Sequence, residues 1–159
     1  MTSTIKNKIS ITAINGRFKK SEKKAKKIVI GILEILKKKK VSVDVYLAGE
    51  ALMKKLNSEL RKKEYSADVL SFEEPKDFFS PENGSEKIGE IFLNWPHIEK
   101  KGKAADKEVQ KLLIHGILHL SGYGHGTDKE AKKMEKKEKE TLEKLKVRKV
   151  HNVHKAKTK

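Results

Sequence analysis

The order of apolar and polar residues along the chain predicts strands that alternate with helices. Apolar and polar residues alternate in Lys8–Ala13 and again in residues 41–47, which is the period-2 pattern of a half-buried strand. Between these strands, apolar residues recur every three or four positions up to about Lys38, so we expect a helix with Ser21 as its N-cap. The apolar residues of this helix are Ala25, Ile28, Val29, Ile32, Leu33 and Leu36.

Similar patterns continue through the middle of the chain. A shorter helix is expected from Ala51 to about Lys62, because leucines recur on one side of it. Two further strands are predicted at residues 68–72 and 88–93. The stretch between them, residues 73–86, is rich in turn residues and is expected to be an exposed loop. Its turn residues are Pro75, Pro81, Asn83 and Gly84, and the helix leucines are Leu52, Leu56 and Leu60.

Two more helices are predicted in the second half of the sequence. The helix from about Lys103 to Leu120 is apolar on nearly every side, which is typical of a buried helix. Thr127 and Glu130 have the spacing of a capping box, and they start a last helix that we expect to end near Leu145. This helix is nearly all lysine and glutamate, so only a few residues attach it to the surface. They are Ala131, Met134, Leu142 and Leu145.

This order of elements predicts an α+β fold. We expect a single domain with one small mixed sheet of about four strands, packed with helices around a central helix. The domain is predicted to span residues 1–147, and a chain of 159 residues fits one domain with one core. Residues 148–159 show no hydrophobic periodicity and are expected to form a basic, disordered tail.

The charge balance points to a polyanionic partner. The net charge is +16, and residues 144–159 contribute seven Lys and Arg and no acid, so the remainder carries 16 − 7 = +9. Such a surface suits nucleic acid, whose phosphates release counterions when lysine or arginine neutralises them. The alternative is that lysine merely solvates the helix faces. The absence of cysteine, of a long apolar run and of a signal-like N-terminus favours the cytoplasm and no membrane.

The most specific chemistry lies in three histidines at the end of the central helix. His115 and His119 are four residues apart, so both rings lie on one helix face, and Gly122 can turn the chain so that His125 joins them. Three nitrogen donors with one open position are typical of a catalytic zinc. We therefore expect a metal-bearing helix and one Zn²⁺ per chain. A single histidine is more often a core residue, but that interpretation does not suit three at this spacing.

The same spacing occurs in zinc proteases of the H-E-x-x-H-x-x-G-x-x-H type. Their glutamate is the general base, and Gly116 stands at that position here. The pattern therefore predicts metal-assisted hydrolysis of a bond other than a peptide bond. His97 is expected to be a surface residue, and His151 and His154 are expected to be tail residues without a ligand role.

Three segments of the chain match known motifs in the same order. Residues 115–125, HGILHLSGYGH, resemble H-G-x-L-H-L-x-G-Y-D-H. Residues 56–72 resemble L-N-x-x-Y-R-x-K-x-x-x-T-D-V-L-S-F, and residues 88–94 resemble L-G-D-I-x-I. In these motifs the chain resembles the YbeY family of bacterial rRNA maturation factors. The resemblance spans roughly residues 40–127. It implies a single-strand-specific, metal-dependent endoribonuclease.

The resemblance also implies roles for individual residues. The zinc ligands fall on His115, His119 and His125, and the functionally important arginine falls on Arg61. A guanidinium can hold a phosphate with two hydrogen bonds and offset charge in the transition state. From its position alone, Arg61 could equally be a solvated residue that ends an amphipathic helix. We take Arg61 and His115 as candidate catalytic residues. Ser71 and Glu90 are weaker candidates.

The chain departs from the family motifs at three positions. The aspartate before the last histidine is Gly124, the tyrosine before the arginine is Leu60, and the threonine before Asp68 is Ala67. An aspartate at position 124 would be a plausible hydrogen-bond partner of a ligand histidine, and loss of such a partner weakens metal binding. The metal ligands themselves are all present.

The sequence therefore predicts a zinc-dependent endoribonuclease that acts in rRNA maturation, at the 3′ end of small-subunit rRNA, and in ribosome quality control. Expected partners are RNA, in rRNA and ribosomal particles, together with ribosomal proteins or assembly factors, and no DNA. The alternative is a non-catalytic zinc-containing assembly factor that binds RNA through its basic surface. A peptidase of unusual design is a third hypothesis. The nucleophile stays open between a metal-bound hydroxide and the RNA 2′-hydroxyl.

Overall fold

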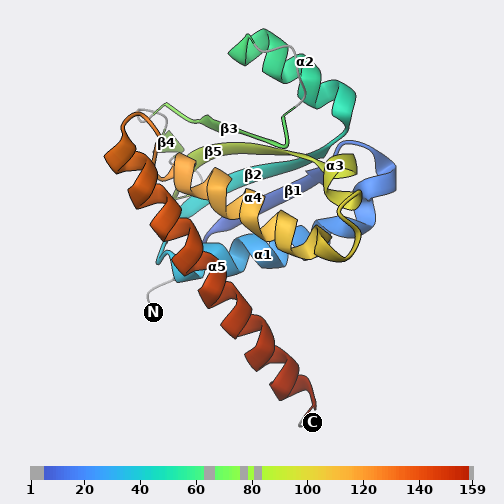
Figure 1. Cartoon of the computed structure of the whole chain (residues 1–159), viewed down its shortest axis with the longest axis vertical. Coiled ribbons are helices and arrows are strands. Elements are labelled where there is room, and N and C mark those ends of the chain that lie inside the picture. Colours follow the sequence, from blue (N-terminus) through green and yellow to red (C-terminus); the bar gives the residue numbers. More distant parts are fainter. Residues whose placement is uncertain (1–5, 63–66, 76–78, 81–83, 158–159) are drawn as a thin grey trace.

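The computed structural model describes residues 6–62, 67–75, 79–80 and 84–157. Its described strands form one mixed sheet in the order β1-β2-β5-β3, and β4 pairs with β5 off this path (Figure 1). Neighbouring strands are parallel from β1 to β2 and from β2 to β5, whereas β3 and β4 run antiparallel to β5. The bounds are β1 Lys8–Ala13, β2 Val41–Ala48, β3 Val69–Glu73, β4 Phe79–Ser80 and β5 Ser85–Asn94.

The described helices surround this sheet, which confirms the predicted α+β fold. Parallel strands need a crossover between them, and α1 supplies it between β1 and β2. The helices are α1 Glu22–Ile35, α2 Glu50–Arg61, α3 Trp95–Glu99, α4 Ala105–Leu120 and α5 Asp128–Lys157, with 3₁₀ turns at Gly16–Ser21 and Gly102–Ala104. No helix in the described part of the chain has both the length and the apolar content to cross a membrane.

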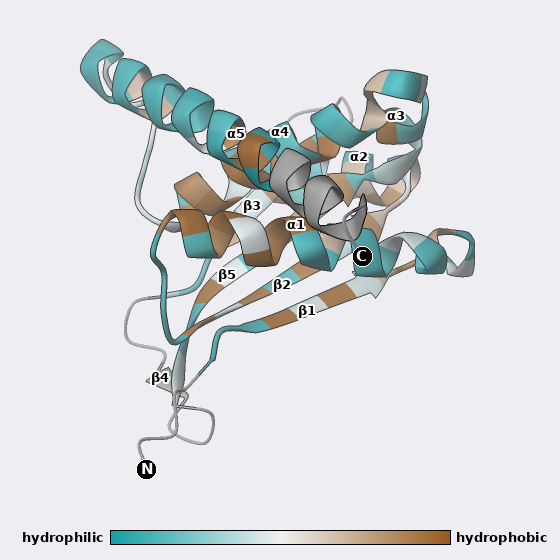
Figure 2. Cartoon of the chain, turned by 90° about the horizontal axis from the view of Figure 1, so that it is seen from below, coloured by the Kyte–Doolittle hydropathy of each residue, from teal (hydrophilic) through white to brown (hydrophobic). Residues whose placement is uncertain are grey.

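The main core lies on one face of the sheet, under α1 and α4. Ile32 of α1 and Ile117 of α4 are fully buried there, as are Val45 of β2 and Ile91 of β5. Figure 2 shows the hydrophobic residues concentrated in these elements. The alternation in β2 and the helical spacing in α1 and α4 thus direct their apolar residues to one shared core.

The other face of the sheet carries α2 and a smaller core. Met53 of α2 packs with Ala48 and Leu70, and Figure 1 shows α2 on the side of the sheet opposite α1 and α4. Leu60, predicted to share the apolar side of α2, is 60% exposed. Arg61 ends α2, and Lys62 caps it in a left-handed conformation. The sheet is therefore covered on both faces, by α1 and α4 on one and by α2 on the other.

The last helix packs more firmly than expected and continues further. Met134 and Thr141 of α5 are buried, and α5 runs past α4 and α1 before it projects beyond the sheet (Figure 1). The predicted end near Leu145 is wrong, since α5 reaches Lys157. No glycine or proline interrupts residues 128–157, and extending a helix costs far less than starting one. Arg148, assigned to a disordered tail, lies within this helix and donates to the Gly31 carbonyl at 3.2 Å.

Two smaller expectations are also corrected. The Ser21 side chain makes no capping hydrogen bond, because the 3₁₀ turn before α1 already gives Ser21 a helical conformation. The stretch expected as a loop contains a short pairing of β4 with the start of β5, so β5 begins at Ser85 rather than at residue 88. Two parts of this stretch, residues 76–78 and 81–83, lie outside the described residues.

Candidate metal centre

The three predicted ligand histidines come together at the C-terminal end of α4. Their nearest ligand nitrogens all lie within 4.8 Å of one another. The buried side of α4 holds residues such as Ile114 and Leu118 in the core, so His115 and His119 fall on its partly exposed flank. His125, in the segment after the helix, is exposed. The grouping is thus open to solvent on one side.

A glycine-terminated turn brings the third histidine back. Gly122 has φ +103, which L-residues rarely adopt. Its N–H donates to the His119 carbonyl at 3.0 Å, and the Tyr123 N–H donates to the Leu118 carbonyl at 3.0 Å. This pair of bonds is a Schellman motif, which ends α4 and reverses the chain. The role predicted for Gly122 in ending the helix is confirmed.

The distances between the rings fit ligands of one ion. The Nε2 atoms of His115 and His119 lie 3.1 Å apart, and the ring of His125 is centred 5.0 Å from that of His119. Two nitrogens about 2.0–2.1 Å from a tetrahedral zinc are separated by roughly 3.3 Å. A hydrogen bond between the two rings would give a similar distance. The arrangement therefore accommodates a divalent ion with little movement of the side chains.

The nitrogens on the far side of two rings have oxygen partners. His119 Nδ1 lies 3.1 Å from the Tyr123 carbonyl, which can only accept, so this nitrogen carries the proton and Nε2 keeps its lone pair. His115 Nδ1 lies 3.5 Å from Glu138 Oε2 on α5. Metal-ligating histidines usually have such a partner on the second nitrogen, which orients the ring and fixes its tautomer.

The surroundings of His119 favour its neutral form. The pKa of His119 is lowered, first because burial disfavours the charged ring, and then because positive charge on His115 and His125 repels a proton. The Arg61 guanidinium acts in the same direction, whereas the Tyr123 carbonyl opposes it. A neutral imidazole is the form that binds a metal, so this environment suits ligation.

The glycine that stands at the position of the protease glutamate is tightly packed against the sheet. A Cβ at position 116 would lie 3.0 Å from both Ile91 Cδ1 and Ser71 Oγ. Position 116 therefore faces the sheet at close range, where a glutamate side chain has no room. The same contact places Ser71 against α4, one residue along the helix from His115.

Arg61 is held beside the histidines by β3. Its Nη2 donates to the Ser71 carbonyl at 2.9 Å, and its Cζ lies 5.7 Å from the centre of the Phe72 ring. The positive charge of Arg61 is also one of the smaller causes of the lowered pKa of His119. The structure thus brings together the three histidines and Arg61, which come from α2, α4 and the turn after α4.

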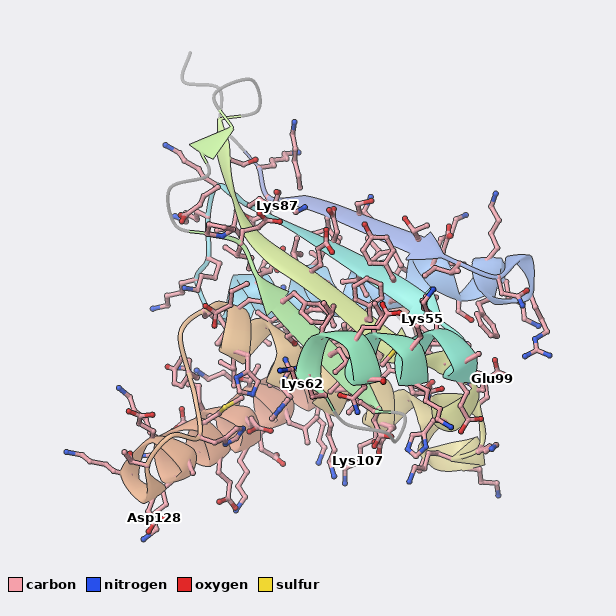
Figure 3. The ribbon with its side chains drawn as sticks, turned by 90° about the horizontal axis from the view of Figure 1, so that it is seen from above. Lys55, Lys62, Lys87, Glu99, Lys107 and Asp128 are labelled. Atoms are coloured by element: carbon pink, nitrogen blue, oxygen red, sulfur yellow. The ribbon has the colours of Figure 1, made fainter. Side chains whose placement is uncertain are left out.

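Glu90, in contrast, belongs to a separate ion cluster. Lys87 Nζ lies 3.2 Å from Glu90, 3.1 Å from Glu74 and 3.3 Å from Asp44. Burial works against the charge on Lys87, but hydrogen bonds to these carboxylates outweigh it and raise the pKa of Lys87. Figure 3 shows Lys87 near the β4–β5 pairing and Lys62 at the end of α2. Glu90 therefore stabilises the sheet rather than joining the histidines.

Sequence reasoning missed Glu138, although a signal was present. Among the α5 side chains that the structure describes, those of Met134, Thr141 and Leu145 are buried, and Glu138 falls on the same stripe at helical spacing. A charged residue inside a buried stripe needs a partner, and here it faces His115. Which partner it finds depends on how α5 docks against α4, which the sequence does not reveal.

A second carboxylate lies close to the position of the missing aspartate. A Cβ at Gly124 would lie 3.8 Å from Glu130 Oε2, and one at Gly126 would lie 3.1 Å from the same atom. Glu130 is placed there because its N–H donates to the Thr127 side-chain oxygen at 3.1 Å, as the capping box predicted. The turn that carries His125 therefore has a carboxylate beside it even with glycine at position 124.

A groove runs from the histidines along α4 and β3. It encloses about 490 Å³, and His115 lines it. Lys111 and Glu138 contribute a cation and an anion to its walls. Its other lining residues are Ala67, Asp68, Val69, Glu108 and Leu112.

The α+β fold and three histidines that could hold one metal ion make this chain a candidate metal-assisted hydrolase. A family sequence model described as endoribonuclease YbeY matches residues 5–146. The chain belongs to this endoribonuclease YbeY family.

Individual relatives agree with this assignment. The chain is 35% identical over 133 residues to endoribonuclease YbeY of Persephonella marina, and the aligned region covers 80% of this chain and 86% of that protein. It is 34% identical over 153 residues to endoribonuclease YbeY of Thermodesulfovibrio yellowstonii, covering 80% of this chain and 91% of the relative. The fold is similar to the solution structure of TM1509 from Thermotoga maritima, with a TM-score of 0.59, 29% identity, and coverage of 91% and 93% of the two chains.

Proposed function

We propose that this protein is a zinc-dependent, single-strand-specific endoribonuclease of rRNA maturation. Its substrate is the 3′ end of small-subunit rRNA, and it takes part in ribosome quality control in the cytoplasm. The observation that carries the proposal is the convergence of His115, His119 and His125 beside Arg61 in a member of an endoribonuclease family. The net charge of +16 supports RNA and ribosomal particles as partners.

The histidines are proposed to hold one Zn²⁺ per chain. Nε2 of His115 and of His119 would bind it, because the Nδ1 atoms of both rings face oxygen atoms of the protein. His125 would complete a three-nitrogen set with an open position towards solvent. A bound zinc supplies a Lewis acid for a phosphoryl oxygen and lowers the pKa of a water molecule at the open position.

Arg61 is proposed to bind the phosphate that is cleaved. One of its five N–H donors is used by the Ser71 carbonyl, which fixes the guanidinium without consuming the others. The guanidinium also packs against the Phe72 ring, which further restricts its orientation. The remaining donors can hold two phosphate oxygens and offset the negative charge that develops during cleavage.

The proposal is tested by replacing His115 with alanine and measuring cleavage and binding of one defined single-stranded RNA. The expected result is loss of cleavage with RNA binding retained, while circular dichroism shows a folded protein. Wild-type protein loaded with zinc that binds this RNA and never cleaves it would instead support a non-catalytic assembly factor. Cleavage by the His115→Ala protein at the wild-type rate would reject the proposed centre.

A further inference from the structure

The geometry points to a second cation site in this protein, formed by Asp68, His97 and Glu108. We infer that it binds a divalent first-row transition ion such as Mn²⁺. The three side chains come from the segment before β3, from α3 and from α4. One ligand atom from each lies within 4.8 Å of the other two. The inference does not depend on whether the protein cleaves RNA.

A buried asparagine holds the first two ligands in place. Asn94 is 3% exposed, and its backbone N–H donates to the Asp68 carbonyl at 2.9 Å. Its side-chain oxygen accepts from the His97 N–H at 3.3 Å, and its side-chain nitrogen donates to the Ala67 carbonyl at 3.4 Å. One buried residue thus fixes the backbone of both ligands before any ion binds, which reduces the cost of ordering the site.

The charges of the three side chains leave a negative excess. His97 Nε2 lies 3.3 Å from Asp68 Oδ1, so a protonated imidazole could balance one carboxylate. Glu108 brings a second carboxylate to the same point, and its side chain forms no hydrogen bond or ion pair with the residues that the structure describes. Two carboxylates carry two negative charges, which one divalent ion balances fully and one imidazolium balances only by half.

The donor set also selects the kind of ion. Carboxylate oxygens suit Mn²⁺, Mg²⁺ and Ca²⁺, whereas an imidazole nitrogen favours transition ions, so the mixture favours Mn²⁺ or Zn²⁺ over Mg²⁺. Ligand atoms about 2.1 Å from such an ion lie roughly 3–3.5 Å apart. The contact of 3.3 Å between His97 and Asp68 already meets this distance, and a Glu108 oxygen lies within 4.8 Å of both ligand atoms.

The proposed site and the three-histidine centre share one groove. Asp68, Glu108 and His115 all line the groove of about 490 Å³. Glu108 and His115 are seven residues apart on α4, which is two turns of the same helix face and about 10.5 Å along the axis. The two sites are therefore separate, and an ion at the second one would attract a phosphate in a groove whose wall is otherwise acidic at that end.

The experiment titrates chelator-treated protein with Mn²⁺ and measures free Mn²⁺ by electron paramagnetic resonance. Glu108→Gln and Asp68→Asn are each expected to bind one equivalent fewer than the wild type at up to about 1 mM free Mn²⁺. Glu99→Gln is the matched control, because Glu99 is exposed on α3 and lies outside the cluster (Figure 3). Comparing variants makes the result independent of any Mn²⁺ bound by the three histidines.

A second measurement uses only wild-type protein. After one equivalent of Zn²⁺ has filled the three-histidine centre, Mn²⁺ at the proposed site should broaden the imidazole proton resonances of His97 at substoichiometric amounts, since the ion would touch that ring. The proposal is overturned if Glu108→Gln binds as much Mn²⁺ as the wild type, or if Glu99→Gln loses an equivalent as well. Sharp His97 resonances in the presence of saturating Mn²⁺ would overturn it too.

Discussion

Replacing Glu138 with glutamine tests whether α5 contributes to the metal centre. Glu138 Oε2 faces His115 Nδ1 at 3.5 Å, and both side chains are 31% exposed. The substitution preserves the shape of the side chain and removes its charge. We expect the variant to fold like the wild type and to release its metal more readily, because the uncharged amide holds the ring less firmly and makes its nitrogen a weaker ligand.

The size of the effect follows from the contact. Loss of a partner on the second nitrogen of a ligand histidine weakens metal affinity by about 10–100-fold. The contact of 3.5 Å is long for a charged hydrogen bond and partly solvated, which places the expected loss near the lower end, at about tenfold or 1.4 kcal/mol. A Glu138→Ala variant should lose at least as much.

The assay is competition for Zn²⁺ with a chromogenic chelator at neutral pH. Glu135→Gln is the matched control, because Glu135 lies on α5 three residues earlier, is largely exposed and pairs with Lys139. It makes the same change in net charge without facing a histidine. Equal zinc affinities for Glu138→Gln and Glu135→Gln would refute the reasoning, and so would a tenfold loss in both.

Four further predictions address the site and the end of the chain. Arg61→Ala should lower the free energy of unfolding by about 1 kcal/mol, because it removes one exposed hydrogen bond and one contact with an aromatic ring. It should reduce the rate of RNA cleavage about 10- to 100-fold in single-turnover kinetics. The pKa of His119 is lowered in the folded protein, so the unfolded chain binds a proton at His119 more readily than the folded chain does. The free energy of unfolding of metal-free protein, measured by chemical denaturation, should therefore fall as the pH drops below about 6.5, and His119 should not change it above that pH. Gly124→Asp should slow zinc loss to a chelator, because position 124 has room for the side chain, although repulsion by Glu130 limits the gain; faster loss would contradict this. Deleting residues 149–159 should leave the melting temperature almost unchanged. It should make the salt dependence of RNA binding shallower: the slope of log K against log[salt] should decrease in magnitude by about 0.7 for each phosphate that the shortened protein no longer neutralises.

Local patterns predicted the parts of the fold whose neighbours in space are also neighbours in sequence. The alternation in Lys8–Ala13 located β1 to the residue, and the helical spacing before Leu120 located α4. The histidine cluster was predictable for the same reason, since a helix turn and one glycine turn suffice to bring the rings together. The β4 pairing was missed because two residues carry too little periodicity.

Features that depend on docking were not predictable. The contact of Glu138 with His115 requires α5 to lie across α4, and no local pattern fixes that angle. His97 was expected to be an ordinary surface residue, but sheet pairing and Asn94 place it beside Asp68. Arg61 was predicted from a resemblance, and its hydrogen bond to the Ser71 carbonyl depends on how α2 lies against β3, which no local pattern fixes.

The central claim is that the three histidines hold the ion needed to cleave RNA. It is tested most directly by measuring how fast chelator-stripped protein cleaves one defined single-stranded RNA, and by repeating the measurement as zinc is added back in steps up to and beyond one equivalent per chain. We predict no cleavage by the stripped protein, recovery that is complete near one equivalent, and no recovery in a folded His119→Ala variant. Stripped protein that cleaves as fast as restored protein would contradict the claim, as would full recovery in the His119→Ala variant.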